Sequence, residues 1–319
     1  MELKKIFSRS ALLLTLSIPV LFASCDKDDD IAASNTITDI VVAGASFTSL
    51  EAAVLKANLQ GTLSGSAQFT VFAPDDAAFT ASGITPAVLN SLTPAQVSNI
   101  ILYHAIPGTI LAAQVPAGPN AKVTTASGDS VFVTRNASGV YVNGIKVSTA
   151  DVAADNGVVH VIGRVLMPPA GNIVETAVAS GLDSLVKAVL RATNGPGGDP
   201  TLANTLSTAR LTVFFFFFAA FTQLLGALSL TDINQIAMPT LLAVLRYHVV
   251  GGRAFSSDLA NGNLAMLAGG NTAINLSNGT GGGPTITGNG NASNRSNITA
   301  TNIVCRNGVV HLIDRVLLP

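Results

Sequence analysis

The sequence predicts two successive copies of an α+β domain, each built on an antiparallel β-sandwich with a layer of helices. Four sequence blocks recur in the same order, at offsets of roughly 135 to 151 residues. A spacing this long exceeds the unit of a solenoid repeat, so each copy is a whole domain. Within each copy the helical patterns come first and short β-branched runs follow, which is the order of an α+β domain and not of a doubly wound sheet.

Each recurring block keeps its apolar pattern and several of its residues in the second copy. The blocks and their counterparts are FTSLEAAVLKA (47–57) with LDSLVKAVLRA (182–192), TVFAPDDAAF (70–79) with TVFFFFFAAF (212–221), IILYHAIPG (100–108) with AVLRYHVVGG (243–252), and NGVVHVIGRVLMP (156–168) with NGVVHLIDRVLLP (307–319).

The helices of each copy can be recognised from apolar spacing and from their capping residues. Apolar residues around Leu50 and Leu185 recur at helical intervals. In the segment 92–104, Thr93 is placed to cap a helix, Pro94 occupies its first position and Gln96 completes a capping box. The segment from 123 to 168 then alternates β-branched runs with Gly, Asn and Asp turns, which is typical of a meander of strands.

The first 24 residues are predicted to be a signal peptide. Lys4, Lys5 and Arg9 precede the apolar stretch 11–24, which is too short to span a membrane. Small residues lead directly to Cys25, a pattern that resembles the lipobox of a bacterial lipoprotein. We therefore expect lipidation of Cys25; the alternative is an ordinary secretory signal with an incidental cysteine.

An acidic run, Asp26 to Asp30, follows that cysteine within a predicted tether at 25–35. Such a run can be a solvated tether and nothing more. By analogy with Gram-negative lipoproteins, it can also direct export to the outer face of the outer membrane. We expect a protein held by its lipid anchor in the outer membrane and exposed at the cell surface.

The repeated blocks resemble those of fasciclin (FAS1) domains. The resemblance rests on FTVFAPDDAAF, on the Tyr-His pair that ends an apolar helix, and on NGVVHVIGRVLMP. It covers one domain at 36–168 and a second at 170–319, nearly all of the predicted mature chain. It implies a wedge-shaped β-sandwich with a helical layer in each domain.

The resemblance also implies a non-catalytic role in adhesion, with an extracellular protein or polysaccharide as partner. An envelope protein that binds a glycan or a small ligand is the alternative, and an enzyme is a distant third. No nucleophile elbow, zinc-protease helix, P-loop or Cys/His cluster appears in the sequence. The net charge of −1 and 11% charged residues argue against a nucleic-acid partner.

The four histidines all fall in the repeated blocks: His104 and His160 in the first copy, His248 and His311 in the second. Two histidines per domain could ligate a metal, but a site needs three or four ligands and no carboxylate recurs beside them. We expect hydrogen-bonded core histidines, and no metal or other cofactor.

The Tyr103–His104 and Tyr247–His248 pairs are candidates for either contact or packing. In animal relatives a motif centred on this pair is linked with receptor-mediated adhesion. Each pair also ends an apolar helix shortly before a glycine turn, where both rings would be packed. The packed interpretation is the stronger one.

The second copy replaces Ala-Pro-Asp-Asp by Phe215, Phe216, Phe217 and Phe218. In the first copy we expect Pro74 to break a strand and Asp75 or Asp76 to cap a helix that begins at Ala77. The phenylalanines supply neither device, and on a surface loop they would form an apolar patch. The run could dock on another surface, touch the membrane or be a sequence artefact. We favour an artefact or an unfavourable variant, because no small residues nearby would accommodate a buried ring cluster.

Overall fold

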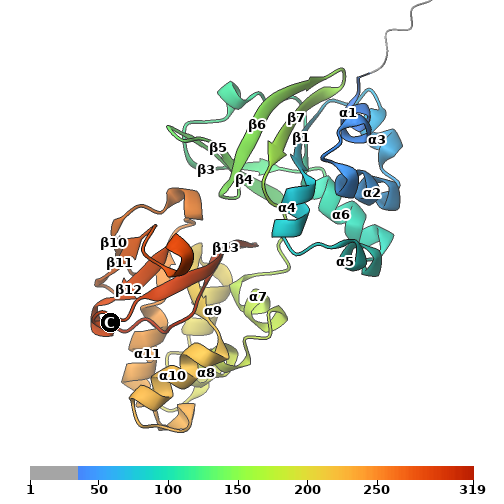
Figure 1. Cartoon of the computed structure of the whole chain (residues 1–319). Coiled ribbons are helices and arrows are strands. Elements are labelled where there is room, and N and C mark those ends of the chain that lie inside the picture. The colour runs from blue at the N-terminus through green and yellow to red at the C-terminus, as the bar shows by residue number, and fades with distance from the viewer. Residues whose placement is uncertain (1–34) are drawn as a thin grey trace, which may run out of the picture. The chain divides into compact units, whose positions relative to one another are not determined.

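The fold is described from a computed structural model, which covers residues 35–319 (Figure 1). The predicted signal peptide, Cys25 and the run Asp26 to Asp30 lie outside the described residues. Within the described part, no helix is long and apolar enough to cross a membrane. We call residues 36–168 the first repeat and residues 170–319 the second repeat.

The first repeat begins with helices and continues with a sheet of seven strands. Its helices are α1 (Ile37–Ala43), α2 (Thr48–Ala57), α3 (Gln60–Ser64), α4 (Asp76–Ala81), α5 (Pro86–Ser91) and α6 (Pro94–Tyr103). Its strands are β1 (Phe69–Pro74), β2 (Ala105–Pro107), β3 (Gly118–Thr124), β4 (Ser130–Asn136), β5 (Gly139–Val142), β6 (Ile145–Ala154) and β7 (Gly157–Ile162).

The second repeat follows the same order, with a 3₁₀ turn where the first repeat has α5. Its helices are α7 (Ile173–Ala179), α8 (Asp183–Asn194), α9 (Leu202–Thr208), α10 (Phe218–Ala227) and α11 (Met238–Arg246). Its strands are β8 (Leu211–Phe216), β9 (Val249–Gly251), β10 (Gly262–Ala265), β11 (Asn271–Asn275), β12 (Thr285–Gly288), β13 (Ser296–Cys305) and β14 (Gly308–Ile313).

The two sheets have the same topology. The strand order is β2-β1-β7-β6-β5-β4-β3 in the first repeat and β9-β8-β14-β13-β12-β11-β10 in the second. The strands after the Tyr-His pair form the predicted antiparallel meander. One pairing was not predicted: β1 runs parallel to β7, and β8 runs parallel to β14. The predicted α+β class with two tandem domains is confirmed.

Strand β6 of the first sheet pairs with different neighbours along its length. Its start pairs with β5 and its remainder pairs with β7, with register shifts on either side of Thr149. Asp151, with φ of 58°, lies in this irregular stretch. Register shifts of this kind are typical of bulges. The buried residues of the first repeat form two main clusters. One lies between helices and sheet around Leu50 and Val159, the other among the strands around Phe72 and Val131.

Local capping chemistry explains where several helices begin. Thr93 and Gln96 form the predicted capping box of α6, with Pro94 in its first turn. Asp75 caps α4, whose first residue is Asp76 and not the predicted Ala77. Pro74 is the last residue of β1, so the strand ends at the proline that was expected to break it.

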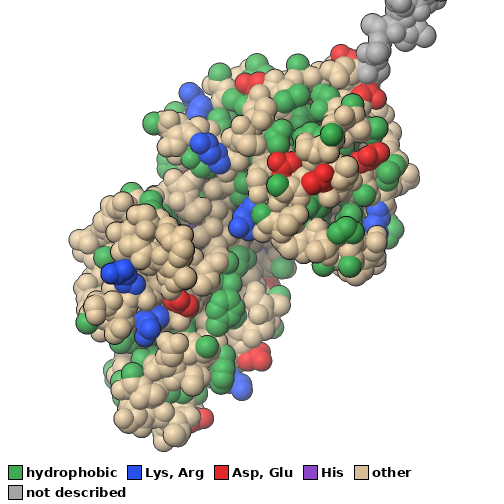
Figure 2. All heavy atoms as spheres, in the orientation of Figure 1, with side chains coloured by type: hydrophobic (Ala, Val, Ile, Leu, Met, Phe, Trp, Pro, Cys, Tyr) green, Lys and Arg blue, Asp and Glu red, His purple; other side chains and the backbone are tan. Residues whose placement is uncertain are grey.

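The surface is mostly uncharged. Figure 2 shows Lys, Arg, Asp and Glu side chains scattered among hydrophobic and uncharged polar ones on the face drawn, in keeping with a sequence that is 11% charged. A local concentration of one sign of charge therefore stands out against this background.

Candidate functional site

The Tyr103–His104 pair is buried at the end of α6. The Tyr103 hydroxyl donates to the Ser130 carbonyl oxygen at 3.0 Å and accepts from the Asn143 side-chain amide at 3.2 Å. Burial raises the pKa of Tyr103 to about 12. Nδ1 of His104 lies 2.8 Å from the Ile100 carbonyl oxygen, and Nε2 accepts from the Leu166 N–H at 2.8 Å. The pair joins the helix to the strands.

The second pair repeats this arrangement. Nδ1 of His248 lies 2.7 Å from the Val244 carbonyl oxygen, and Nε2 accepts from the Leu317 N–H at 2.9 Å. The Tyr247 hydroxyl donates to the Asn271 carbonyl oxygen. Both histidines therefore carry their proton on Nδ1, and burial lowers the pKa of each to about 4. All four side chains of the two pairs are buried.

His160 and His311 lie at equivalent positions in β7 and β14 but differ in their partners. Nε2 of His160 lies 2.9 Å from the Ile110 carbonyl oxygen, and Nδ1 accepts from the Asp151 N–H at 3.1 Å. Nε2 of His311 lies 3.0 Å from the Ala254 carbonyl oxygen, but its Nδ1 has no partner within the described residues. The expectation of hydrogen-bonded core histidines is therefore met by Nε2 of His311 but is wrong for its Nδ1. Burial lowers the pKa of His311 to about 4.

The phenylalanine run is divided between strand and surface. Phe215 and Phe216 are buried in β8, whereas Phe217 and Phe218 are 41% and 71% exposed. The expected surface patch of four rings is thus wrong for the first two and holds only for the last two. Phe217 occupies the N-cap of α10 and makes no side-chain hydrogen bond there.

The buried half of the run is accommodated by its surroundings. Phe216 stacks on Phe221 with ring centroids 5.9 Å apart. The same core cluster contains four small residues, Ala177, Ala188, Ala192 and Ala220. The expectation that no small residues would lie near the rings is therefore wrong. Phe214, Phe215 and Phe216 also line an apolar cavity of about 70 Å³, so the core around them is not overfilled.

The two repeats meet at an aromatic contact. Phe132 of β4 and Phe255 of the second repeat have ring centroids 5.9 Å apart, and the Arg253 guanidinium lies 3.9 Å from the Phe132 centroid. The Asn120 side-chain amide donates to the Arg253 carbonyl oxygen at 2.8 Å and to Asp258 Oδ2 at 2.9 Å. These contacts join segments more than a hundred residues apart.

Gly144 allows this approach. It lies in the turn between β5 and β6 with φ of +73°, and a Cβ there would lie 2.6 Å from Cβ of Phe255. A side chain would both strain the backbone and separate the repeats.

The repeated blocks hold the loop that carries Arg253 and Phe255. Thr212 Oγ1 accepts from the Ala254 N–H at 2.8 Å, and Nε2 of His311 lies 3.0 Å from the Ala254 carbonyl oxygen. Both backbone groups of Ala254, between the two interface residues, are therefore fixed by the second repeat. Thr212 of the TVF block and His311 of the NGVVH block thus hold the loop that forms the contact between the repeats.

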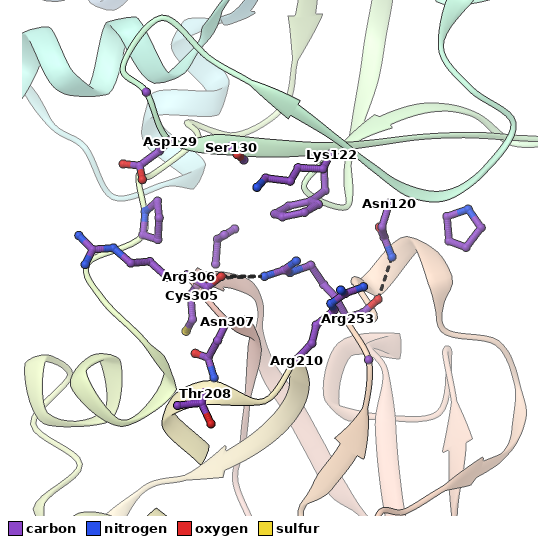
Figure 3. Close-up of a pocket in the computed structure, with 16 residues that line it drawn as sticks. Asn120, Lys122, Asp129, Ser130, Thr208, Arg210, Arg253, Cys305, Arg306 and Asn307 are labelled. Carbon is purple, nitrogen blue, oxygen red and sulfur yellow. Dashed lines mark hydrogen bonds between the residues drawn. The ribbon is translucent and has the colours of Figure 1, made fainter. Parts of the chain in front are cut away.

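A cleft of about 930 Å³ lies beside this contact, and we call it the inter-repeat cleft (Figure 3). Both repeats line it. Its lining residues are Pro119, Asn120, Lys122, Gly128, Asp129, Ser130, Phe132, Pro169, Thr208, Arg210, Gly252, Arg253, Val304, Cys305, Arg306 and Asn307.

Positive charge predominates in the cleft. Four of the lining residues are Lys or Arg, namely Lys122, Arg210, Arg253 and Arg306, and Asp129 is the one acid. Figure 3 shows Lys122 on the first repeat, facing the arginines of the second. Burial, and next the charge of Arg210, lower the pKa of Arg253. Its Nη2 donates to the carbonyl oxygens of Cys305 at 3.3 Å and Arg306 at 3.2 Å.

Sequence reasoning missed this cleft. Its cations are single residues separated by 43 to 88 positions and form no run or stripe in the sequence. The Asn143-Gly144 pair is the one sequence feature that marks this region. It predicts a tight hairpin turn, but not that the turn packs against the second repeat.

Comparison with known proteins supports the family inferred from the repeated blocks. The fasciclin domain model matches residues 45–168 and 198–319. Protein sll1483 from Synechocystis sp. is 38% identical over 136 residues, which are 42% of this chain and 74% of that protein. Transforming growth factor-beta-induced protein ig-h3 from Sus scrofa is 33% identical over 135 residues, which are 42% of this chain but only 20% of that protein.

Among solved structures, a FAS1 domain pair from the insect cell adhesion molecule Fasciclin I aligns with 88% of this chain and 96% of its own, at a TM-score of 0.40 and 17% identity. The fasciclin model covers most of the chain in two successive matches. The chain belongs to the fasciclin domain family, with two tandem domains.

Proposed function

We propose that this chain is a non-catalytic adhesion protein that binds an extracellular protein or polysaccharide. Fasciclin domains occur in cell adhesion and extracellular matrix proteins. The observation that carries the proposal is the use of the motif residues. Tyr103, His104, Tyr247 and His248 are buried and joined to the chain's own backbone. Buried groups of this kind have no access to a bound substrate, so the repeated blocks build a scaffold.

The proposal includes a lipid anchor at Cys25 and a place at the outer face of the outer membrane. It rests on the signal peptide pattern, the lipobox-like residues before Cys25 and the run Asp26 to Asp30. In this arrangement the membrane holds the N-terminus, and the two domains extend to the outside on an acidic tether.

A second candidate function is an envelope protein that binds a glycan or small ligand. The inter-repeat cleft favours it, because about 930 Å³ is in the range of ligand sites. The two functions are compatible if the adhesion partner is itself a polysaccharide.

A deletion strain compared with its complemented strain tests the adhesive role. Complementation should restore attachment to other cells or to matrix-coated surfaces, and equal attachment of both strains would end the proposal.

A Cys25→Ser chain should remain an uncleaved precursor or be released without lipid. Mass spectrometry that finds the wild-type mature N-terminus free of acyl chains would reject the anchor while leaving adhesion open to the first test.

A further inference from the structure

The inter-repeat cleft concentrates unpaired positive charge. Within residues 35–319 the structure has one pair of oppositely charged side chains in contact, Arg246 with Asp199 at 2.7 Å. The His160 ring, whose Nδ1 accepts from the Asp151 N–H, also lies 3.9 Å from the Asp151 carboxylate. Neither involves a cation of the cleft. A concave site lined by one sign of charge focuses its field outward and attracts the opposite charge.

Three of the four cations are free to meet a ligand. Lys122, Arg210 and Arg306 are exposed, and their side chains make no hydrogen bond within residues 35–319. Each can therefore bind an anionic group without first breaking a contact of the fold. Lys122 comes from the first repeat and the two arginines from the second, so one ligand could contact both repeats.

Arg253 supplies a charge in the cleft that is held by hydrogen bonds to the carbonyl oxygens of Cys305 and Arg306. Its guanidinium lies against Phe132, and its Nε is buried without a partner in the described part of the chain. Loss of solvent around a cation that no carboxylate neutralises is costly. An anion in the cleft would reduce that cost, which is a physical reason for the site to prefer one.

We propose that the inter-repeat cleft binds a segment of an acidic polysaccharide. Carboxylate or sulfate groups of the sugar chain contact Lys122, Arg210 and Arg306. Sugar hydroxyls contact the Ser130 hydroxyl and the Asp129 carboxylate, which also line the cleft. This inference rests on the proposed adhesive role, because it names the class of ligand that the adhesion protein would bind.

The lining favours a sugar chain over a peptide or a nucleic acid. Tight protein partners insert aromatic anchors into apolar pockets, and single-stranded nucleic acids stack their bases on exposed aromatic rings. Phe132 is the one aromatic residue of the lining, and Arg253 and Phe255 already contact it. The groups that remain free are three cations, the Ser130 hydroxyl and the Asp129 carboxylate, which match a chain of hydroxyls and anions.

The test measures binding of the purified full-length chain to labelled polygalacturonate and to labelled dextran sulfate. Neutral dextran and poly-glutamate are the comparison ligands. The variant Arg210→Glu/Arg306→Glu should weaken binding of the polyanionic sugars roughly tenfold or more. The control Lys146→Glu/Lys187→Glu carries the same net charge on exposed residues outside the cleft lining, and it should bind within about twofold of wild type.

Comparison of the two polyanions shows whether the site prefers carboxylate or sulfate. Equal losses in the cleft and control variants, or no binding of either sugar, would overturn the proposal, and so would poly-glutamate that binds as tightly as the sugars. If neither sugar binds while the complemented strain still adheres, the cleft assignment fails and the adhesive role stands. If the sugars bind at the cleft but the deletion and complemented strains attach equally, the cleft assignment stands and the adhesive role fails.

Discussion

At the scale of single residues, the side chains that identify the repeats serve the fold. His104 and His248 each link a helix carbonyl to a backbone N–H near the end of their repeat, at Leu166 and Leu317. In that position a ring must remain neutral, because a protonated ring could no longer accept from the N–H. The protonation state of these residues therefore affects the stability of the fold.

The buried histidines predict that stability falls in mild acid. In the folded state the pKa values of His104, His248 and His311 are about 4, against 6.5 for an ordinary histidine. Between these values the unfolded chain binds more protons, so the free energy of unfolding decreases as the pH falls from 6.5 towards 4 and levels off below. The expected loss is on the order of 2 kcal/mol per histidine between pH 7 and pH 5.

Urea unfolding at several pH values measures this slope. The variant His104→Gln/His248→Gln has two fewer titrating groups and should show a shallower dependence, even if it is less stable at pH 7. A free energy of unfolding that stays level from pH 7 to pH 5 in the wild-type chain would contradict the buried neutral rings.

Phe217 leaves α10 without a cap, so Phe217→Asp should stabilise the second repeat. In the first repeat Asp75 holds the equivalent place and accepts from the Ala78 N–H at 2.7 Å. A new carboxylate should reach the Ala220 N–H in the same way and raise the free energy of unfolding by about 0.5 to 2 kcal/mol. Thermal unfolding measures the gain. Phe215 and Phe216 are left unchanged, because their rings are buried.

The reverse change in the first repeat is the matched control. Asp75→Phe should lower the free energy of unfolding by a similar amount, because it removes the same kind of cap. If Phe217→Asp instead lowers stability, or converts a dimer to a monomer in light scattering, then the exposed rings of Phe217 and Phe218 form an interface and the account of a missing cap is wrong.

At the scale of elements, one asparagine in each NGVVH block joins three segments. The Asn307 Oδ1 accepts from the Ile173 N–H at the start of α7 at 2.9 Å. Its Nδ2 donates to the carbonyl oxygens of Leu206 and Ala209, at 3.0 and 2.8 Å. Asn156 makes the same three contacts in the first repeat, with Ile37, Leu63 and Gly65. The asparagine fastens the first and third helices of each repeat to its last strand.

Asn307→Ala should therefore be strongly destabilising. It leaves one donor and two acceptors without a partner, and the expected loss in free energy of unfolding is about 2 to 4 kcal/mol. Asn263→Ala changes an exposed asparagine of β10 and should stay within about 0.5 kcal/mol of wild type. Urea unfolding of both variants at pH 7 gives the comparison. Equal midpoints for the two variants would show that the triple contact contributes little.

The elements show how far the sequence could predict the fold. Apolar spacing and local caps identified the helices, as Thr93 and Gln96 illustrate, because both signals act within a few residues. The parallel pairing of β1 with β7 could not be predicted, since it joins residues about ninety positions apart. The different partners of His160 and His311 also depend on tertiary detail, in this case the position of one backbone N–H at Asp151.

At the scale of the whole molecule, the candidate site exists only because two copies of one domain meet. Lys122 comes from the first repeat, and Arg210 and Arg306 come from the second. The sequence showed both domains but not their contact, because Phe132, Gly144 and Phe255 have no repeated pattern that marks them. The copies share a scaffold, and the candidate site is lined by residues at which they differ.

We propose that the chain adheres through this cleft. The most direct measurement is the attachment of cells that carry wild-type or Arg210→Glu/Arg306→Glu chain to a surface coated with polygalacturonate or dextran sulfate. The Lys146→Glu/Lys187→Glu chain serves as the charge-matched control, at equal surface expression. We expect attachment to be lost in the cleft variant and retained in the control. Attachment of the cleft variant at the wild-type level would contradict it.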